Sequence, residues 1–599
     1  MQALILAAGM GKRLKELTQN NTKCMVKVAG VTLIERMLRQ IEKQNVSRIV
    51  IVVGYEGKKL IDYISTLGIA TPIEYVENPI YDKTNNIYSL ALAKSHLCED
   101  DTLLFESDLI FEDAVLDLLV NDPRDTLALV DKFESWMDGT CVKLSKDDRI
   151  TSFVSKKEFR FDDIHEYYKT VNISKFSKEF SEKYYVPFLE AYEKALGENQ
   201  YYEEVLKVIT ILDVPRIRAR RLEGQLWYEI DDVQDLDIAE SLFAGTPDEK
   251  TALIQGRYGG YWRYPKMKDF CYLVNPYFPP RKMLDEIKAN FDMLISQYPS
   301  GMRVNSLLAA KNFNVHIENI VIGNGAAELI KSLMSQFTGK TGFIRPTFEE
   351  YPNRYNAPDA VCYVPNNTDF SYTADNVMNF FEDKGVSQIV IVNPDNPTGN
   401  FIPKTDLLRL VLWSAGKGIK LVIDESFVDF ADEAPTLIER ELLDANPHLY
   451  VMKSISKSYG VPGLRLGVLA SGDIATIARM KKDVSIWNIN SFGEFYMQIQ
   501  EKYNKDYQAA LVKIRAERAR FAEELGKIEG VRVIPSQANF IMVELKNAMP
   551  KEILKKLLFK HQILIKDLSS KTGGRYLRIA VRNTEDNDLL LEALREELS

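Results

Sequence analysis

The sequence predicts an α/β protein built from two domains. Short apolar runs alternate with stretches of helical spacing along most of the 599 residues, and strands separated by helices form parallel sheets with both faces covered. The alternation breaks at Gly245–Asp248 and starts again after about residue 252. A chain of this length is too long for one hydrophobic core. We therefore expect one domain over residues 1–246 and another over residues 252–599.

Buried strands are expected where apolar residues run together. In the first domain these runs are Ala3–Ala8, Arg48–Val53, Thr102–Phe105, Thr210–Val214 and Gln225–Ile230. Leu33–Gln44 has the spacing of a helix, and Glu158–Glu204, rich in aromatic and charged residues, suggests a mainly helical insertion or lid. The clear runs of the second domain are Ile317–Ile322, Gln388–Val392 and Lys420–Ile423.

Composition narrows the classes of function. The net charge of -9 argues against a nucleic-acid binder, which usually carries a basic surplus. Five scattered cysteines show neither metal spacing nor a disulfide pattern, which favours a reducing compartment. No segment has the length and apolarity of a membrane span, and the N-terminus lacks the pattern of a signal peptide. We expect a cytoplasmic protein that binds neither nucleic acid nor membrane.

A glycine-containing turn follows the first predicted strand. The segment Leu6–Leu14 reads Leu-Ala-Ala-Gly-Met-Gly-Lys-Arg-Leu. Glycines let the backbone approach a phosphate chain, and an arginine fork binds two phosphate oxygens at once. Taken alone, such a segment is more often a plain strand-to-helix turn than a phosphate site. Lys23 and Lys27, followed by Val28–Ile34, add cations a short loop further on.

With these lysines, the first 245 or so residues resemble the sugar-phosphate and phosphocholine nucleotidyltransferases. Asn78–Leu90 and Trp227–Leu236 are similar to the cytidylyltransferase branch that activates phosphocholine. The resemblance implies a Rossmann-like, GT-A-like domain that takes CTP, with Lys23 on the α-phosphate and Arg13 on the outer phosphates. The residues expected at the nucleotide are Leu6, Ala7, Ala8, Gly9, Gly11, Arg13, Lys23, Asn85, Asn86 and Ser89.

Two carboxylates are candidate ligands of Mg²⁺. Asp108 follows the strand Thr102–Phe105, at the edge where open α/β sheets bind ligands, and Asp231 ends a later strand. A lone Asp at a strand end more often caps a helix, but the resemblance makes this pair the metal carboxylates, with Asp232 as an alternative to Asp231. Mg²⁺ needs few protein ligands when phosphates and waters supply the rest.

An amine pocket is a further expectation for this domain. Aromatic rings and carboxylates attract a cation, and Tyr168 and Glu203 are the residues that we assign to the substrate. The neighbouring candidates are Tyr167, Tyr201, Tyr202 and Glu204. A helix-packing face explains the same residues equally well.

The segment Ser454–Gly467 indicates a pyridoxal-phosphate (PLP) site. It reads Ser-Ile-Ser-Lys-Ser-Tyr-Gly-Val-Pro-Gly-Leu-Arg-Leu-Gly. A lysine beside serines, with an arginine eight residues later, suits a Schiff-base lysine next to a phosphate pocket. Lys457 is then the lysine that joins the cofactor, and Ser454, Ser456 and Arg465 hold its phosphate.

From about residue 252 the chain resembles fold-type I aminotransferases, in the branch of histidinol-phosphate aminotransferase and threonine-phosphate decarboxylase. The resemblance implies that Asp424 pairs with the pyridinium nitrogen and that Arg578 grips the substrate carboxylate, with Arg582 near a phosphonate. It also implies a homodimer, because Tyr298 matches a tyrosine lent to the neighbouring subunit's cofactor phosphate. The other implied cofactor contacts are Gly325, Ala326, Ala327, Phe348 and Asn396.

One departure leaves the second reaction open. Many aminotransferases carry a tyrosine three residues after the aspartate, but this chain has Phe427 there. The phenylalanine also occurs in the phosphate-specific decarboxylase branch, so the motifs fit transamination and decarboxylation.

As a whole, the chain resembles the fused cytidylyltransferase–aminotransferases of phosphonate biosynthesis. That resemblance implies transamination of phosphonoacetaldehyde to 2-aminoethylphosphonate with an amino-acid donor, followed by condensation with CTP to CMP-2-aminoethylphosphonate and pyrophosphate. The alternative is a phosphocholine or phosphoethanolamine cytidylyltransferase fused to a phosphoserine or phosphothreonine decarboxylase. A third hypothesis makes one half a non-catalytic domain, and the presence of Lys23, Asp108, Asp424 and Lys457 argues against it.

Overall fold

The chain divides into two compact units, Met1–Arg263 and Tyr264–Ser599. The computed structural model describes residues 1–212, 214 and 216–599. Each unit is α/β, as the sequence predicts, and has a main sheet of its own. The break at Gly245–Asp248 coincides with the start of helix α10 (Pro247–Gly256). Thr246 and Glu249 cap this helix, because the side chain of each accepts a bond from the backbone amide of the other. The proposed domain limits at 246 and 252 stay predictions.

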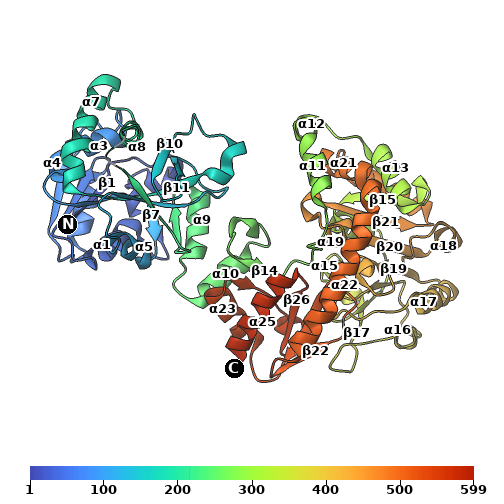
Figure 1. The fold of residues 1–599 in the computed structure, drawn as a ribbon. Coiled ribbons are helices and arrows are strands. Elements are labelled where there is room, and N and C mark those ends of the chain that lie inside the picture. Colours follow the sequence, from blue (N-terminus) through green and yellow to red (C-terminus); the bar gives the residue numbers. More distant parts are fainter. Residues whose placement is uncertain (213, 215) are drawn as a thin grey trace. The chain divides into compact units, whose positions relative to one another are not determined.

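A nine-stranded sheet forms the centre of the first unit (Figure 1). Its order is β10-β9-β11-β6-β1-β4-β5, with β8 paired to β11 and β12 paired to β8. The strands are β1 (Gln2–Ala7), β4 (Ile49–Val53), β5 (Ile73–Glu77), β6 (Thr102–Glu106), β8 (Leu127–Lys132), β9 (Cys141–Leu144), β10 (Ile150–Val154), β11 (Tyr168–Phe176) and β12 (Arg218–Arg221).

The parallel sheet that the alternation predicts is present in this unit, but it makes up only part of the main sheet. Strands β6, β1, β4 and β5 are parallel, but β11 runs antiparallel to β6, β8 and β9. β9 and β10 pair antiparallel across a short turn, a connection that needs no helical crossover. A two-stranded sheet of β7 (Leu109–Phe111) and β13 (Trp227–Glu229) lies apart from the main one.

Helices cover both faces of this sheet because alternate residues of each strand point to opposite sides. Ala3 and Ile5 of β1 belong to the core shared with α1 and α5, while Leu4 and Leu6 belong to the core shared with α3, α7 and α8. Figure 1 shows these two sets of helices on opposite sides of the sheet. The helices of the unit are α1 (Leu33–Glu42), α2 (Gly57–Ser65), α3 (Asn86–Leu92), α4 (Lys94–Leu97), α5 (Asp113–Val120), α6 (Lys178–Phe180), α7 (Val186–Leu196), α8 (Glu203–Ile209) and α9 (Val233–Leu242), before α10.

Two expectations for the middle of this unit need correction. Glu158–Glu204 is mostly helical, as expected, but it is not an insertion or lid, because it also supplies β11, whose inner residues pair on both sides with other strands and are buried. Thr210–Leu212 form a turn after α8, and the strand of this region is β12. Asp213, also part of the expected strand, lies outside the described residues.

The second unit contains a seven-stranded sheet of order β15-β21-β20-β19-β18-β16-β17. Only β21 among these runs antiparallel to its neighbours. The strand expected at Ile317 begins at Ile320, after a 3-10 turn. The strands are β15 (Ile320–Asn324), β16 (Thr341–Ile344), β17 (Ala360–Tyr363), β18 (Gln388–Val392), β19 (Lys420–Asp424), β20 (Leu449–Ser454) and β21 (Leu466–Ser471).

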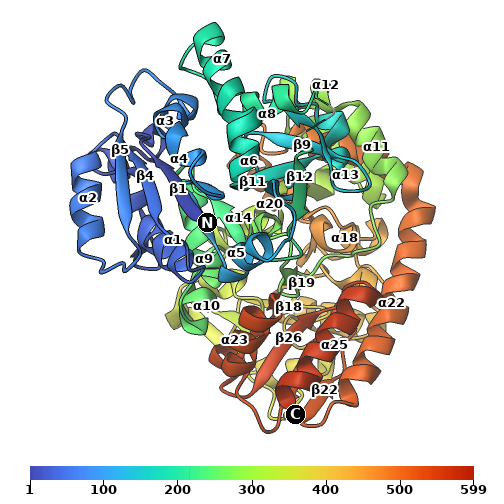
Figure 2. The ribbon, with the colours of Figure 1, turned by 60° about the vertical axis from the view of Figure 1, so that its left-hand side comes forward.

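A smaller antiparallel sheet of order β22-β23-β26-β25 follows in the same unit. Its strands are β22 (Val531–Ile534), β23 (Phe540–Leu545), β25 (Lys566–Asp567) and β26 (Tyr576–Ala580). The long helix α22 (Asn504–Gly526) and α25 (Thr584–Leu598) lie beside each other along this sheet (Figure 2). The short strand β14 (Lys268–Asp269) pairs with β24 (Ile563–Leu564).

Helices of the second unit pack on its sheets, and two of them, α14 and α19, contribute to the second site described below. They are α11 (Arg281–Ala289), α12 (Phe291–Ser296), α13 (Met302–Phe313), α14 (Ala326–Ser335), α15 (Glu350–Asn353), α16 (Ala374–Phe381), α17 (Lys404–Lys417), α18 (Arg440–Ala445), α19 (Ile455–Ser458), α20 (Ile474–Asp483), α21 (Ser491–Ile499), α23 (Pro550–Lys560) and α24 (Ser569–Thr572). Within the described part of the chain, every helix is too short or too polar to cross a membrane.

Candidate active sites

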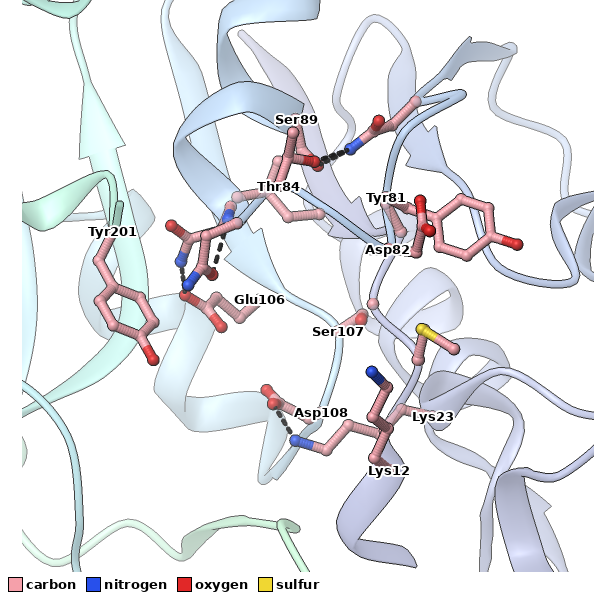
Figure 3. Close-up of a pocket in the computed structure, with 18 of the residues that line it drawn as sticks. Lys12, Lys23, Tyr81, Asp82, Thr84, Ser89, Glu106, Ser107, Asp108 and Tyr201 are labelled. Atoms are coloured by element: carbon pink, nitrogen blue, oxygen red, sulfur yellow. Dashed lines mark hydrogen bonds and ion pairs between the residues drawn. The ribbon is translucent and has the colours of Figure 1, made fainter. Parts of the chain in front are cut away.

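The first site is a cavity of about 490 Å³ at the carboxyl ends of β1, β5 and β6. The carboxyl ends of parallel strands are where open α/β sheets bind ligands. Figure 3 shows Tyr201 at one side of this cavity, Tyr81 and Asp82 at the other, and Asp108 with Lys23 below Glu106. Of the expected nucleotide residues, Leu6, Ala8, Gly9, Gly11, Arg13, Lys23, Asn85, Asn86 and Ser89 line it. Ala7 does not, because its side chain faces the opposite hydrophobic core.

The turn after β1 packs closely against Lys23, which begins the 3-10 turn Lys23–Met25 and lines the cavity. Gly11 has φ +59, a left-handed conformation that glycine adopts without strain. A side chain at Gly11 would have its Cβ 3.0 Å from Cβ of Lys23. The turn therefore needs glycine for its conformation and for the close approach of Lys23.

Lys23 joins the two predicted metal carboxylates. Its Nζ lies 2.5 Å from Oδ2 of Asp108 and 2.8 Å from Oδ1 of Asp231, and Arg13 reaches the same Asp231 oxygen at 2.5 Å. Burial disfavours the lysine charge, but the attraction of Asp108 and Asp231 outweighs it and raises the pKa of Lys23. Oδ1 of Asp108 is buried and has no hydrogen-bond partner among the described residues. This oxygen and its neighbours are the hard, anionic donors that Mg²⁺ prefers.

Asp232 lies beside Asp231 but serves another purpose. Its side chain accepts bonds from the backbone amides of Gln234 and Asp235, and so caps helix α9. Asp231 instead points to Lys23 and Arg13. The geometry therefore favours Asp231 over Asp232 as the metal carboxylate.

Sequence reasoning missed two glutamates of this site. Glu229 brings a carboxylate oxygen within 4.8 Å of those of Asp108 and Asp231, and Glu106 lines the cavity and accepts a bond of 2.9 Å from Asn86 Nδ2. The signal was present, because Glu106-Ser-Asp108 and Glu229-Ile-Asp231 repeat the pattern Glu-x-Asp. Residues two apart at a strand end point to the same side.

Burial gives these glutamates an unusual electrostatic environment. It raises the pKa of Glu106, and the charges of Asp108, Glu203 and Glu229 raise it further. Burial also raises the pKa of Glu203 to about 7 and that of Glu229 above its ordinary value. Such groups gain from a nearby cation because water screens their charges poorly.

The residues expected to form an amine pocket lie in different parts of the first unit. Tyr201 lines the cavity, whereas the ring of Tyr168 already has Lys132 and Arg221 against it, at 4.5 and 4.9 Å from its centroid. Tyr167 packs in a separate small core with Cys141 and Val154. Tyr202 is buried in the core shared with α3, α7 and α8. Glu203 lies near Glu106, behind the residues that line the cavity. The geometry therefore gives Tyr168 no access to this cavity.

The second site surrounds Lys457 in the other unit. Lys457 lies on the one-turn helix α19, between Ser454 at the end of β20 and the loop to β21. Burial, together with the positive charges of Arg578 and Arg465, lowers the pKa of Lys457 to about 8. A lysine with a lowered pKa is a better nucleophile near neutral pH. Oγ of Ser456 is buried and has no hydrogen-bond partner among the described residues. This hydroxyl is therefore available to donate to a phosphate oxygen.

The amino end of α14 faces the same site. Gly325 precedes this helix with φ +77, and a Cβ there would overlap the guanidinium of Arg465. The amides of Ala326 and Ala327 begin the helix, where a phosphate is favourably bound. The expected phosphate residues of the cofactor therefore lie together.

Asp424 ends β19 and is buried. It accepts a bond of 2.8 Å from the hydroxyl of Tyr351 and one of 2.9 Å from the backbone amide of Ser426. Burial raises the pKa of Asp424, although these bonds and Lys457 oppose the rise. Tyr351 was missed, because its link to Asp424 spans 73 residues of sequence. Phe427 packs edge-to-face on Phe540 at 5.2 Å and offers no hydroxyl to the site.

The two predicted substrate arginines differ in how many of their hydrogen-bond donors already have a partner. Arg578 donates 2.7 Å to Asn396 Oδ1 and 2.8 Å to the backbone oxygen of Cys271, while its buried Nε has no partner among the described residues. Arg582 is held by Asp586 and by the backbone oxygen of Asp269. Arg578 thus keeps a free donor, whereas Arg582 is already paired.

Two expected cofactor residues lie at the surface. Phe348 is 38% exposed, and Tyr298 is 81% exposed with its ring 4.6 Å from that of Trp487. The expected contact of Tyr298 with a second subunit stays a prediction.

Known proteins resemble each half. Residues 303–594 match the family described as aminotransferase class I and II, and residues 3–141 match the MobA-like NTP transferase domain. The L-serine phosphate decarboxylase of Sulfurospirillum multivorans is 34% identical over 344 residues, which cover 55% of this chain and 87% of that protein. A solved decarboxylase of that organism has a TM-score of 0.51 at 31% identity, covering 55% and 95% of the two chains. The histidinol-phosphate aminotransferase of Clostridium acetobutylicum has a TM-score of 0.50 at 26% identity, covering 55% and 99%.

One similarity spans both halves. The CMP-5'-(3-aminopropyl)phosphonate synthase of Streptomyces rubellomurinus is 31% identical over 601 residues, which cover 100% of this chain and 95% of that protein. The chain belongs to this synthase family. It is an enzyme that fuses a nucleotidyltransferase unit to a fold-type I PLP unit.

Proposed function

We propose that this protein is a bifunctional enzyme that transfers CMP to a short aminoalkyl phosphonate and that forms the amine in its second unit. One observation carries the proposal. The first cavity has cations and the proposed metal carboxylates at one end, and the partly buried Glu106 with Tyr201 elsewhere on its wall. One part suits nucleotide phosphates, and the other suits an ammonium group. The full-length similarity to a phosphonate synthase supports the same substrate class.

Asp108 and Asp231 would hold Mg²⁺, which would supply charge neutralisation at the triphosphate. Lys23, which is paired with both carboxylates, would turn its ammonium to the α-phosphate once they are neutralised by the metal. An ionised phosphonate oxygen attacks the α-phosphorus of CTP. The bond from that phosphorus to its bridging oxygen breaks, and pyrophosphate leaves. Because the nucleophile is already ionised, the residues need to orient groups and balance charge rather than remove a proton.

The second unit would hold PLP through Ser456, Arg465 and the amino end of α14, with Lys457 and Asp424 at the ring. The fit rests on the lowered pKa of Lys457 and on Oγ of Ser456, which has no partner in the part of the chain that the structure describes. PLP supplies an electron sink for bonds at the carbon that bears the amino group. Arg578, with a free buried Nε, would bind the substrate carboxylate.

Two reactions fit this second unit, and we favour decarboxylation. Phe427 and the 34% identity to an L-serine phosphate decarboxylase support it. The carboxylate of an amino acid with a phosphoryl or phosphonyl end would leave as carbon dioxide, and its carbon would take a proton. Transamination of phosphonoacetaldehyde is the second candidate, because residues 303–594 match the aminotransferase family. It would consume an amino-acid donor and release a 2-oxo acid.

Product analysis separates the candidates. The holoenzyme with CTP and Mg²⁺ is given either phosphono- and phospho-amino acids or phosphonoacetaldehyde with amino-acid donors, and products are followed by phosphorus NMR. Decarboxylation predicts carbon dioxide and a CMP-linked aminoalkyl product, whereas transamination predicts a 2-oxo acid. If no CMP–phosphonate bond forms with ready-made 2-aminoethyl- or 3-aminopropylphosphonate, the proposed first reaction is wrong.

A further inference from the structure

Strand β11 is irregular where it passes the acidic groups of the first unit. Against β8 its register shifts between Thr170 and Ser174, so two extra residues bulge from the pairing. Asn172 within this bulge has φ +59, a left-handed conformation uncommon outside glycine. Bulges re-aim side chains and recur beside active sites. Here the bulge turns polar side chains of β11 toward Glu229.

Lys169, just before the bulge, is only 1% exposed. Its Nζ lies 3.2 Å from Oε2 of Glu229 and 2.8 Å from the backbone oxygen of Thr170. Asn172 donates its Nδ2 to the other oxygen, Oε1 of Glu229, at 3.3 Å. Lys169 and Asn172, both on β11, thus bind the two carboxylate oxygens of Glu229.

Glu229 itself is fixed to the metal carboxylates through the backbone. In the small sheet, Glu229 of β13 pairs with Leu109 of β7. The backbone amide of Ile230 donates a hydrogen bond of 3.0 Å to the backbone oxygen of Asp108. Rotation of its side chain nevertheless decides whether the carboxylate lies in the group with Asp108 and Asp231. The two bonds from β11 restrict that rotation.

We propose that Lys169, assisted by Asn172, is a positioning residue that holds Glu229 toward Asp108 and Asp231 and so sets the affinity of this group for a divalent cation. The inference rests on the proposed nucleotidyl transfer. Lys169 touches neither nucleotide nor acceptor in this arrangement, because it is absent from the cavity wall. Its effect passes through Glu229.

A purely structural role for Lys169 must be separated from positioning. Lys169 is a cation beside three carboxylates, the buried Glu203 and the partly buried Glu106 and Glu229. Lys169→Met alone adds an unbalanced buried negative charge and endangers folding. The double variant Lys169→Met/Glu203→Gln also removes the Glu203 carboxyl, so fewer acidic groups are left without their cation. It is compared with Glu203→Gln alone.

The main readout is binding of Mn²⁺ to the full-length protein in the presence of CTP, measured by electron paramagnetic resonance without acceptor. We expect about ten-fold or more weaker Mn²⁺ binding in the double variant than in Glu203→Gln, the effect usual for residues that orient metal ligands. Adding Glu229→Gln to both should abolish this difference. Lys175→Met is the matched control, because Lys175 is a buried lysine of the same strand that binds the backbone oxygen of Asp122.

Asn172→Gly gives an independent test that keeps the charge. Glycine accepts φ +59 without strain, so this variant keeps the bulge. It loses the bond to Glu229 and the bonds that Oδ1 of Asn172 accepts from Thr170 and Lys169. Weaker Mn²⁺ binding is expected, and the melting temperature reports any wider loss of stability. Equal Mn²⁺ binding by the double variant and Glu203→Gln overturns the inference. That result leaves the proposed function intact, whereas a wild-type protein that transfers no CMP in Mg²⁺ overturns the proposed function itself.

Discussion

Two adjacent aspartates, Asp231 and Asp232, provide a test at the scale of single residues. Asp231 faces Lys23, and Asp232 caps α9. Asp231→Asn should lower CMP transfer at least about 100-fold, because a charged ligand of the metal is lost. Asp232→Asn should keep activity, since asparagine caps a helix as well as aspartate does. Steady-state release of pyrophosphate checks both. The reverse pattern would make Asp232 the metal ligand.

Asp108→Ala should abolish CMP transfer and leave the PLP reaction nearly unchanged. The proposed metal carboxylate and Lys457 belong to different units, each with its own sheet. Removal of Mg²⁺ by EDTA should have the same selective effect. Both reactions are measured on one preparation, the second by its amine product. Full CMP transfer by the variant in Mg²⁺ would exclude Asp108 as a ligand.

Lys457 carries a prediction about pH. With its pKa lowered to about 8, the amine is neutral above that pH, whereas an ordinary lysine stays charged to about 10.4. The rate at which the cofactor-free enzyme takes up PLP should therefore rise with pH and level off near 8 to 9. Stopped-flow absorbance measures it, and borohydride reduction with peptide mapping should locate the cofactor on Lys457. Lys457→Ala should lose this covalent attachment while CMP transfer survives. A cofactor adduct on another lysine would contradict the assignment.

At the scale of elements, the amino end of α14 depends on a glycine. Gly325→Ala forces a side chain into a left-handed position and against Arg465. We expect PLP affinity to fall about ten-fold or more, with a loss of stability of about 1 kcal/mol or more from backbone strain. Gly463→Ala is the control, because a Cβ at that exposed turn meets no atom within 4 Å. Fluorescence titration with PLP compares them. Equal affinities would show that this helix end does not bind the cofactor phosphate.

At the scale of the whole molecule, the two units should work independently. A mixture of the Asp108→Ala and Lys457→Ala variants should restore the complete two-step product, because each variant keeps the site that the other lacks. Phosphorus NMR would detect the CMP-linked product in the mixture and in neither variant alone. Activity of both single variants without product from the mixture would mean that the intermediate does not pass between chains.

Much of both sites could be predicted from local patterns. Gly9 to Arg13, Lys23 and Asp108 follow strands that were recognisable as apolar runs, and the turn around Lys457 is contiguous in sequence. The pairing of Tyr351 with Asp424 and that of Lys169 with Glu229 were not predictable in this way. They join residues 73 and 60 positions apart, and periodicity within a strand says nothing about its partner.

The sequence by itself determined the two α/β units, because apolar runs and glycine turns are local features with a fixed physical meaning. It also determined the chemical character of both sites, since those residues adjoin the strand ends. Only the tertiary structure decided the direction of β11, the use of Asp232 as a helix cap and the pairing of Arg582 with Asp586. Each depends on which groups meet across the fold and on which hydrogen bonds are already satisfied there. Burial of Glu106 and Glu229 has the same origin, because dehydration of a carboxylate depends on every element packed around it.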